Sequence, residues 1–199
     1  MLIFGLILAG GEGRRFGGAD KAFLPLGDRC LFDRVADRFS PQVAGLAISA
    51  NGDGQRFTRF GYEILPDAGV ARLGPMAGLA AGLAWLERSG GSHLATVPVD
   101  APFLPCDLVA HLADAAAGAR GGPVIAESGG RLHPTCGLWP VSLGPSLAAA
   151  LTLGERRIGL WALAQGAVRV PFAETTPDAF MNLNTPADLA AAEAALGHW

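Results

Sequence analysis

Short apolar runs alternate along the chain with longer stretches rich in alanine and leucine. The run 94–99 is hydrophobic at nearly every position, which is typical of a strand buried on both faces of a parallel sheet. The longer stretches have the composition of helices. Strands are expected at 2–8, 45–50, 62–65, 94–99, 123–126, 132–138, 168–172 and 180–182. Helices are expected at 31–39, 76–88, 106–117, 142–152, 156–164 and 186–196.

This alternation predicts an α/β fold, a doubly wound, mainly parallel sheet with helices on both faces. Prolines fit the expected boundaries, because Pro98 would end a strand while Pro75 and Pro186 would stand in the first turn of helices. No repeat or linker interrupts the pattern, so residues 1–199 are expected to form one domain. Ligands of such sheets bind beyond the carboxyl ends of the strands, which makes the loops after strands the first candidates for a site.

Composition narrows the class of protein. Half of the residues are hydrophobic and 17% are charged, which indicates a globular chain. The formal net charge is −3 and no run of basic residues occurs, so we expect no nucleic-acid partner. The apolar opening stops at Gly10 and is too short to cross a bilayer, and the three separated cysteines form no metal or disulfide motif. We therefore expect a cytoplasmic protein without a membrane partner.

The loop that follows the first predicted strand, 9–21, is the most informative segment. It combines several glycines with Arg14, Arg15 and Lys21. Glycines let backbone N–H groups turn towards an anion, and the cations can neutralise phosphate charge. The glycine spacing matches neither the Walker A loop nor the dinucleotide fingerprint. The loop predicts a nucleotide triphosphate seat at the end of the first strand.

Two aspartates follow other predicted strands. Asp100 comes directly after the run 94–99, where a carboxylate could bind Mg²⁺ together with substrate phosphates. Asp67 follows 62–65 and could accept both N1–H and N2–H of guanine, or help to position the metal. Either residue could instead stabilise a turn. The shared edge of the sheet favours the binding interpretation for Asp100.

Several later segments offer weaker candidates. The glycines and proline of 74–78 would let a helix N-terminus approach an anion, or simply start the helix. His133, before a proline, could bond a second substrate or be structural. Asn182 and Asn184 would project to one side of an extended segment, where their amides could bind a ligand, add to a metal shell or form a turn. The arginines of 154–157 could serve an anionic substrate or remain solvated.

In their order and spacing these motifs resemble the nucleotidyltransferases that act on the molybdenum cofactor, and more narrowly the molybdenum cofactor guanylyltransferases. The first motif, Leu-Ala-Gly-Gly-x3-Arg-x-Gly-Gly-x-Asp-Lys at 8–21, is shared by many nucleotidyltransferases. The later motifs, above all the asparagine pair before Thr-Pro, carry the narrower resemblance. They lie at 74–78, 98–103, 133–135, 154–157 and 182–186, so that the resemblance covers nearly the whole chain.

This resemblance implies transfer of GMP from GTP to the phosphate of molybdopterin, with release of pyrophosphate and formation of molybdopterin guanine dinucleotide. It implies Mg²⁺ held by Asp100, and recipient molybdoenzymes or their chaperones as partners. The implied catalytic residues are Arg15, Lys21 and Asp100. The implied GTP contacts are Leu8, Ala9, Gly10, Gly11, Lys21, Asn51, Asp67 and Asp100. The implied molybdopterin side consists of His133, Arg156, Asn182 and Asn184.

The second strand departs from the family pattern, because Ser49 stands where an asparagine is usual, and the base contact is therefore assigned to Asn51. Two other functions stay open. The chain could be a cytidylyltransferase or another nucleotidyltransferase on a related phosphorylated acceptor, which nucleotide preference would show. It could also be a non-catalytic carrier of GTP or cofactor, which would release no pyrophosphate. A dehydrogenase is disfavoured by the glycine spacing.

Overall fold

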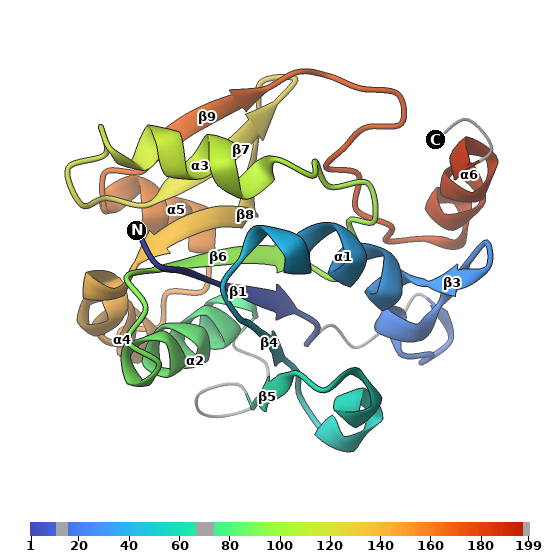
Figure 1. Cartoon of the computed structure of the whole chain (residues 1–199), viewed down its shortest axis with the longest axis horizontal. Coiled ribbons are helices and arrows are strands. Elements are labelled where there is room, and N and C mark those ends of the chain that lie inside the picture. The colour runs from blue at the N-terminus through green and yellow to red at the C-terminus, as the bar shows by residue number, and fades with distance from the viewer. Residues whose placement is uncertain (11–15, 67–73, 197–199) are drawn as a thin grey trace.

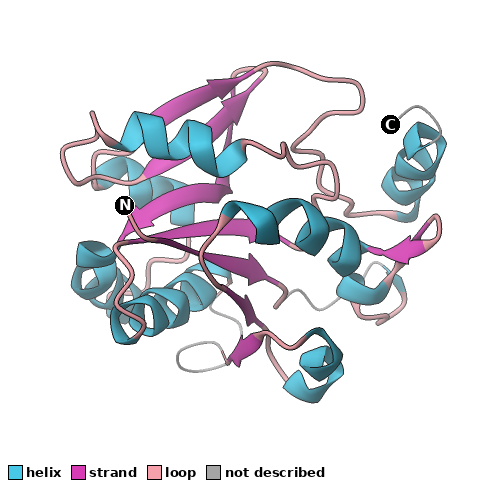
Figure 2. Cartoon of the chain, in the orientation of Figure 1, coloured by secondary structure: helices cyan, strands magenta, loops and turns pink. Residues whose placement is uncertain are grey.

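A computed structural model gives the structure of the chain and describes residues 1–10, 16–66 and 74–196. Within these residues seven strands form one sheet in the order β5-β4-β1-β6-β8-β7-β9 (Figures 1 and 2). Of these seven, β8 alone runs antiparallel to its neighbours, so the expected mainly parallel sheet is confirmed. The bounds are β1 Ile3–Leu8, β4 Leu46–Ser49, β5 Glu63–Leu65, β6 His93–Pro98, β7 Val124–Ser128, β8 Arg131–Pro140 and β9 Val168–Phe172.

Helices cover both faces of the sheet. On one face lie α1 (Leu31–Phe39) and α3 (Leu108–Ala116), which are in front in Figure 1. On the other face lie α2 (Pro75–Arg88), α4 (Gly144–Thr152) and α5 (Ile158–Ala164). Successive strand residues serve opposite faces, so Ile7 packs in the α1 layer and Leu6 in the α2 layer. The expected doubly wound arrangement is confirmed.

A smaller unit stands beyond the carboxyl ends of the strands. The hairpin of β2 (Pro25–Leu26) and β3 (Arg29–Cys30) packs with α6 (Pro186–Leu196) around a separate apolar cluster. Figure 1 shows α6 and β3 at the end of the molecule towards which the arrowheads of β1 and β6 point. This unit therefore borders the sheet edge where the candidate residues were expected.

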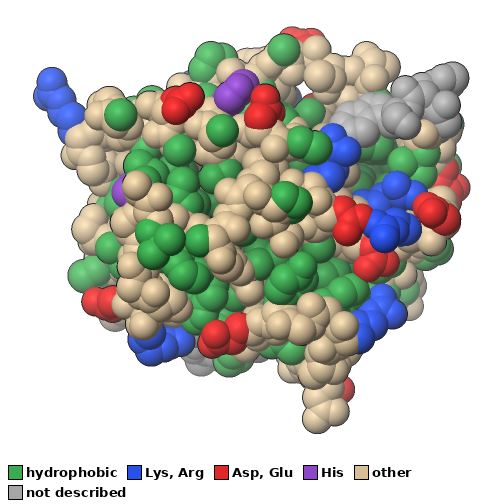
Figure 3. Space-filling view, viewed as in Figure 1, with side chains coloured by type: hydrophobic (Ala, Val, Ile, Leu, Met, Phe, Trp, Pro, Cys, Tyr) green, Lys and Arg blue, Asp and Glu red, His purple; other side chains and the backbone are tan. Residues whose placement is uncertain are grey.

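Charged side chains gather at this end of the face shown in Figure 3, over α1 and the β2–β3 hairpin. Arg29 pairs there with Asp37, and Arg34 lies 2.9 Å from Asp28. These arginines are thus matched by acids of the same segment.

No helix in the described ranges has the length and apolar character needed to cross a membrane.

One predicted strand is wrong. Residues 180–182 form a loop, because Asp178 starts a turn in which its side chain accepts from Phe180 N at 2.9 Å and its carbonyl from Met181 N at 3.0 Å. The apolar character there serves packing, since Phe180 is buried. The sequence pattern also missed the short β2–β3 hairpin and the 3-10 helices. These are η2 Lys21–Phe23, η3 Ser40–Gln42, η4 Gly54–Phe60 and η5 Val141–Leu143.

Two glycines let α2 lie close to the sheet. A Cβ on Gly78 would stand 2.4 Å from Ser49 Oγ, and a Cβ on Gly82 would stand 2.6 Å from Leu6 Cδ2. At the N-cap, Gly74 has a φ of 68°, which other residues rarely adopt. The 74–78 motif therefore has a packing reason in addition to the anion-binding role expected from its sequence.

Candidate active site

The ends of three neighbouring strands stay locked together past their last residues. Ala9 N donates to Ser49 O at 2.8 Å, and Val99 N donates to Leu8 O at 3.1 Å. These bonds carry β1, β4 and β6 side by side up to the loops that hold the candidate residues. Leu8, Ala9 and Gly10 lie at this edge, and Asn51 follows β4 two residues after its end.

Lys21 and Asp100 meet at this edge although 79 positions separate them. Lys21 Nζ forms an ion pair with Asp100 Oδ2, and the two side chains are only 12% and 16% exposed. Asp20 prepares the contact, because its Oδ1 accepts from Ala22 N at 3.1 Å and starts η2. The expected meeting of the basic loop and the acid after β6 is confirmed.

Asn184 completes this cluster from the far end of the chain. Its Oδ1 accepts from Lys21 Nζ at 2.9 Å. The preceding residue is fixed as well, since Leu183 N donates to the carbonyl of Asp100 at 2.9 Å. The loop before α6 and the loop after β6 thus form one hydrogen-bonded unit. Asn182 contributes its backbone carbonyl to this unit, which accepts a hydrogen bond from Asn184 Nδ2 at 3.4 Å.

His133 lies at the start of β8 with its ring buried. Its Nε2 is 3.1 Å from Ser128 Oγ, and the ring stacks on Phe180 at 4.6 Å between centroids. Burial lowers the pKa of His133, which keeps the imidazole neutral at pH 7. The stack holds the segment that leads to Asn184 against β8, so the ring has a clear structural function.

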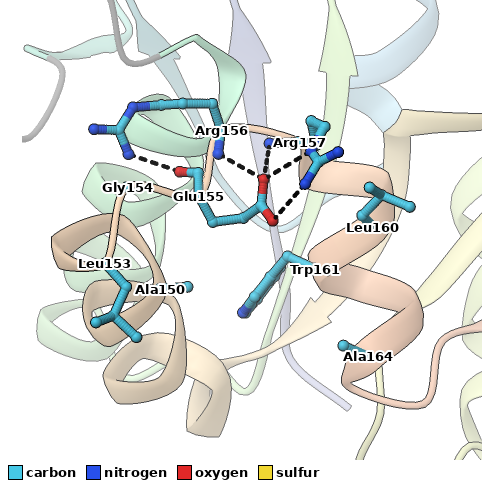
Figure 4. Close-up of a pocket in the computed structure, with 9 residues that line it drawn as sticks. All are labelled: Ala150, Leu153, Gly154, Glu155, Arg156, Arg157, Leu160, Trp161 and Ala164. Atoms are coloured by element: carbon cyan, nitrogen blue, oxygen red, sulfur yellow. Dashed lines mark hydrogen bonds and ion pairs between the residues drawn. The ribbon is translucent and has the colours of Figure 1, made fainter.

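Arg156 and Arg157 occupy the loop between α4 and α5 (Figure 4). Arg156 donates to the carbonyls of Leu151 at 3.1 Å and Glu155 at 2.7 Å. Arg157 pairs with Glu155 at 3.2 Å and lowers the pKa of that carboxyl to about 2. Both arginines line an open pocket of about 650 Å³ together with Trp161. The structure therefore ties them to their own loop and does not join them to the Lys21–Asp100 pair.

This loop nevertheless adjoins the start of β8. A Cβ on Gly159 would stand 3.0 Å from Pro134 Cγ, so the first turn of α5 lies against the residue after His133. Pro134 and His133 are successive residues of β8 and face opposite sides of the sheet, so α5 packs on the face away from the His133 ring. Three other predicted site residues, Gly11, Arg15 and Asp67, lie outside the described residues.

Comparison with known proteins identifies the family. The family model described as the MobA-like NTP transferase domain matches residues 5–168. The chain belongs to this family. The molybdenum cofactor guanylyltransferase of Cereibacter sphaeroides (strain ATCC 17029 / ATH 2.4.9) is 52% identical over 196 residues, which cover 98% of either chain. The one from Rhodobacter capsulatus is 50% identical and covers 97% of this chain and 96% of its own length.

Solved structures agree on the fold of this MobA-like NTP transferase. The molybdopterin-guanine dinucleotide biosynthesis protein A of Archaeoglobus fulgidus has a TM-score of 0.81 at 24% identity and is covered completely, as is this chain. The 2-C-methyl-D-erythritol 4-phosphate cytidylyltransferase of Thermus thermophilus has a TM-score of 0.68 at 21% identity, with 98% of both chains covered. The resemblance inferred from the sequence motifs is confirmed.

The donors at the MobA-like site fit a magnesium ion that is shared with a nucleotide. Among the described residues there is no group of three or more His, Cys, Asp or Glu able to hold a metal. Magnesium commonly binds one or two carboxylates plus substrate phosphates and keeps several waters. Asp100, with an amide oxygen of Asn184 on the same lysine, matches that donor chemistry.

Sequence reasoning missed how the Asn184 segment is held. Asp188 Oδ2 accepts from the backbone N–H groups of both Asn184 and Thr185 at 2.8 Å. These hydrogen bonds, the one from Asn184 foremost, lower the pKa of Asp188. The Thr-x-x-Asp pattern at 185–188 signals the helix cap, but the extra bond to Asn184 has no signature in spacing.

Proposed function

We propose that this MobA-like NTP transferase transfers GMP from GTP to the terminal phosphate of molybdopterin and forms molybdopterin guanine dinucleotide. The observation that carries the proposal is the convergence of Lys21, Asp100 and Asn184 at the carboxyl edge of the sheet. Its support is the activity named for relatives that share half of their residues with this chain over nearly the full length. Molybdoenzymes or their chaperones are the proposed recipients of the product, and the cytoplasm is the proposed location of this protein.

In the proposed reaction an oxygen of the acceptor phosphate attacks the α-phosphorus of GTP. The bond between the α-phosphorus and its bridging oxygen breaks, and pyrophosphate leaves with that electron pair. The protein contributes position and charge stabilisation, because the chemistry needs no covalent enzyme intermediate. Fixed cations and donors around the reacting phosphates supply that stabilisation.

Lys21 is suited to meet the triphosphate. An ammonium has three donors, and the contacts with Asp100 and Asn184 account for two of them and fix its direction. The third can meet a phosphate oxygen. We assign a related role to Arg15, and contacts with the nucleotide to Leu8, Ala9, Gly10, Gly11, Asn51 and Asp67.

Asp100 would hold the magnesium ion, which when bound neutralises phosphate charge. On the other side of the site we propose that His133, Arg156, Asn182 and Asn184 line the molybdopterin side. His133 is neutral and stacked on Phe180, so it would act by holding the segment that leads to Asn182 and Asn184. Arg156 belongs to the α4–α5 loop, which precedes the turn of α5 that packs on Pro134.

Pyrophosphate release tests the proposal. The wild-type chain is expected to release pyrophosphate only when GTP, molybdopterin and Mg²⁺ are all present, and chelation of the metal should abolish release. Asp100→Asn is expected to lower kcat/KM by about 100-fold or more while the fold survives, as for other groups that stabilise transition-state charge. Asp114→Asn, on the exposed side of α3, removes the same charge away from the site and should be neutral.

The alternative functions give different results in this assay. A carrier would bind GTP and molybdopterin without pyrophosphate release. A cytidylyltransferase would prefer CTP in the same assay. If guanine is read by Asp67, Asp67→Asn should reduce the preference for GTP over CTP. Activity of Asp100→Asn equal to wild type would remove the assigned metal role.

A further inference from the structure

We propose that Asp188 is a positioning residue for the transfer reaction, holding Asn184 so that its amide oxygen stays on Lys21 beside Asp100. The inference rests on the proposed function, because it concerns the same cluster. Asp188 itself touches none of the reacting groups. It acts on the backbone of the residue that does.

The carboxylate of Asp188 reaches further than a helix cap requires. The cap itself is reciprocal: Thr185 Oγ1 accepts from Asp188 N at 3.2 Å, and Asp188 Oδ2 accepts from Thr185 N at 2.8 Å. The same oxygen also accepts from Asn184 N at 2.8 Å, two residues before the first residue of α6. That additional bond does nothing for the helix. It fixes the peptide from which the Asn184 side chain projects.

On its N-terminal side the peptide is held by Leu183, whose side chain is fully buried in the cluster that α6 shares with the β2–β3 hairpin. The neighbouring bond from Leu183 N to the carbonyl of Asp100 anchors one side of it. The other side continues into α6, which packs on the β2–β3 hairpin in a small cluster of its own and not on the main sheet. Asp188 is therefore the side chain that fixes the N–H of Asn184 itself.

Charge reinforces the link. The Lys21 ammonium is among the groups that favour the ionised form of Asp188. The lysine is thus surrounded by the carboxylate of Asp100, the amide oxygen of Asn184 and the nearby negative charge of Asp188. Loss of Asp188 would therefore have two effects. It would release the backbone of Asn184, and it would remove a negative charge that attracts the Lys21 ammonium.

The experiment compares Asp188→Ala with Thr185→Ala. Both variants remove half of the α6 cap, but only the first removes the acceptor of Asn184 N. Asp188→Ala is expected to lower kcat for pyrophosphate release about 10- to 100-fold, as misplacement of a positioning group by about 1 Å does. KM for GTP should change less than about threefold, because that loss falls on alignment of the reacting groups. Thr185→Ala should keep kcat within about threefold of wild type, because Asn184 N keeps its acceptor in this variant and Asn184 stays in position.

Two further measurements separate positioning from loss of stability. Hydrogen exchange at the Asn184 amide should accelerate in Asp188→Ala and not in Thr185→Ala. In an Asn184→Ala background, Asp188→Ala should have almost no further effect on kcat, since the two residues act through one contact. Glu193→Gln removes a negative charge from an exposed position on α6 and controls for charge alone.

Equal kcat losses in Asp188→Ala and Thr185→Ala, or independent effects of Asp188 and Asn184, would overturn the inference. If Asp188→Ala does not fold, Asp188→Asn serves instead; it keeps an acceptor oxygen without the charge and is expected to give a smaller loss of kcat. The proposed function fails separately, when the wild-type chain itself releases no pyrophosphate from GTP and molybdopterin.

Discussion

At the scale of single residues, the site depends on contacts between positions that are remote in sequence. The sequence alone made Lys21, Asp100 and Asn184 candidates, because each follows a predicted strand or precedes a predicted helix cap. It could not predict that one ammonium binds both oxygen donors, since that depends on how η2 and the Asn184 loop fold over the strand ends. It also left the role of His133 open, because burial of that ring depends on Phe180, 47 positions later.

The Lys21–Asp100 ion pair is expected to be needed for activity but to add little to the free energy of unfolding. Lys21→Met leaves a carboxylate that is only 16% exposed without its cation, which should cost about 1–3 kcal/mol. The double variant Lys21→Met/Asp100→Leu should recover most of that loss without activity, because apolar replacement of a partly buried ion pair is often neutral. Urea unfolding measures both effects, and a double variant less stable than Lys21→Met would contradict this account.

Burial of His133 predicts a dependence of stability on pH. The unfolded chain binds a proton at histidine near pH 6.5, whereas burial lowers the pKa of His133 in the folded chain. The free energy of unfolding should therefore be fully retained above about pH 6.5 and decrease below it. His93 shifts in the same direction for the same reason and adds to the effect.

His133→Gln isolates the contribution of His133. At pH 7.5 it should destabilise the chain by about 1 kcal/mol, because the stack on Phe180 is lost. At pH 5.5 the difference from wild type should shrink. The wild type loses stability there because its buried His133 ring resists protonation, whereas glutamine does not titrate. Thermal or urea unfolding at the two pH values checks this, and a difference that grows towards low pH would be evidence against it.

At the scale of elements, the regular strands were predictable and the short irregular ones were not. Strands β1 and β6 are apolar on both faces because helices cover both faces, so their sequences show it. The β2–β3 hairpin has two residues in each strand, too few for any periodicity, and 180–182 is apolar because Phe180 packs on His133. The close contact of α2 with the sheet also escaped prediction, because it depends on the neighbours of its glycines.

That contact predicts a local packing limit. Gly82→Val places a side chain against Leu6 and Leu94, which are fully buried, and should destabilise the chain by about 1–3 kcal/mol. Ala84→Val adds bulk to the same helix at an exposed position and should lower the free energy of unfolding by about 0.5 kcal/mol or less. Equal losses in the two variants, measured by urea unfolding, would rule out the packing explanation.

At the scale of the whole molecule, both helical layers share one sheet and should unfold together. Trp85, Trp139 and Trp161 all belong to the α2 layer, so in a Trp199→Phe background tryptophan fluorescence reports on one face while circular dichroism reports on all helices. The expected single domain predicts coincident urea transitions for the two signals. Transitions at different urea concentrations would divide the chain into two units.

Strand β6 lies at the centre of this arrangement and has Asp100 just beyond its end. Segments that precede it provide Lys21 and the residues assigned to GTP, whereas β8, the α4–α5 loop and the Asn184 loop follow it. In the proposed assignment, most residues that bind the nucleotide therefore precede those on the molybdopterin side in the sequence. A chimera with residues 1–100 of this chain and the remainder of a relative that uses another phosphorylated acceptor should keep its preference for GTP. It should transfer GMP to the acceptor of that relative.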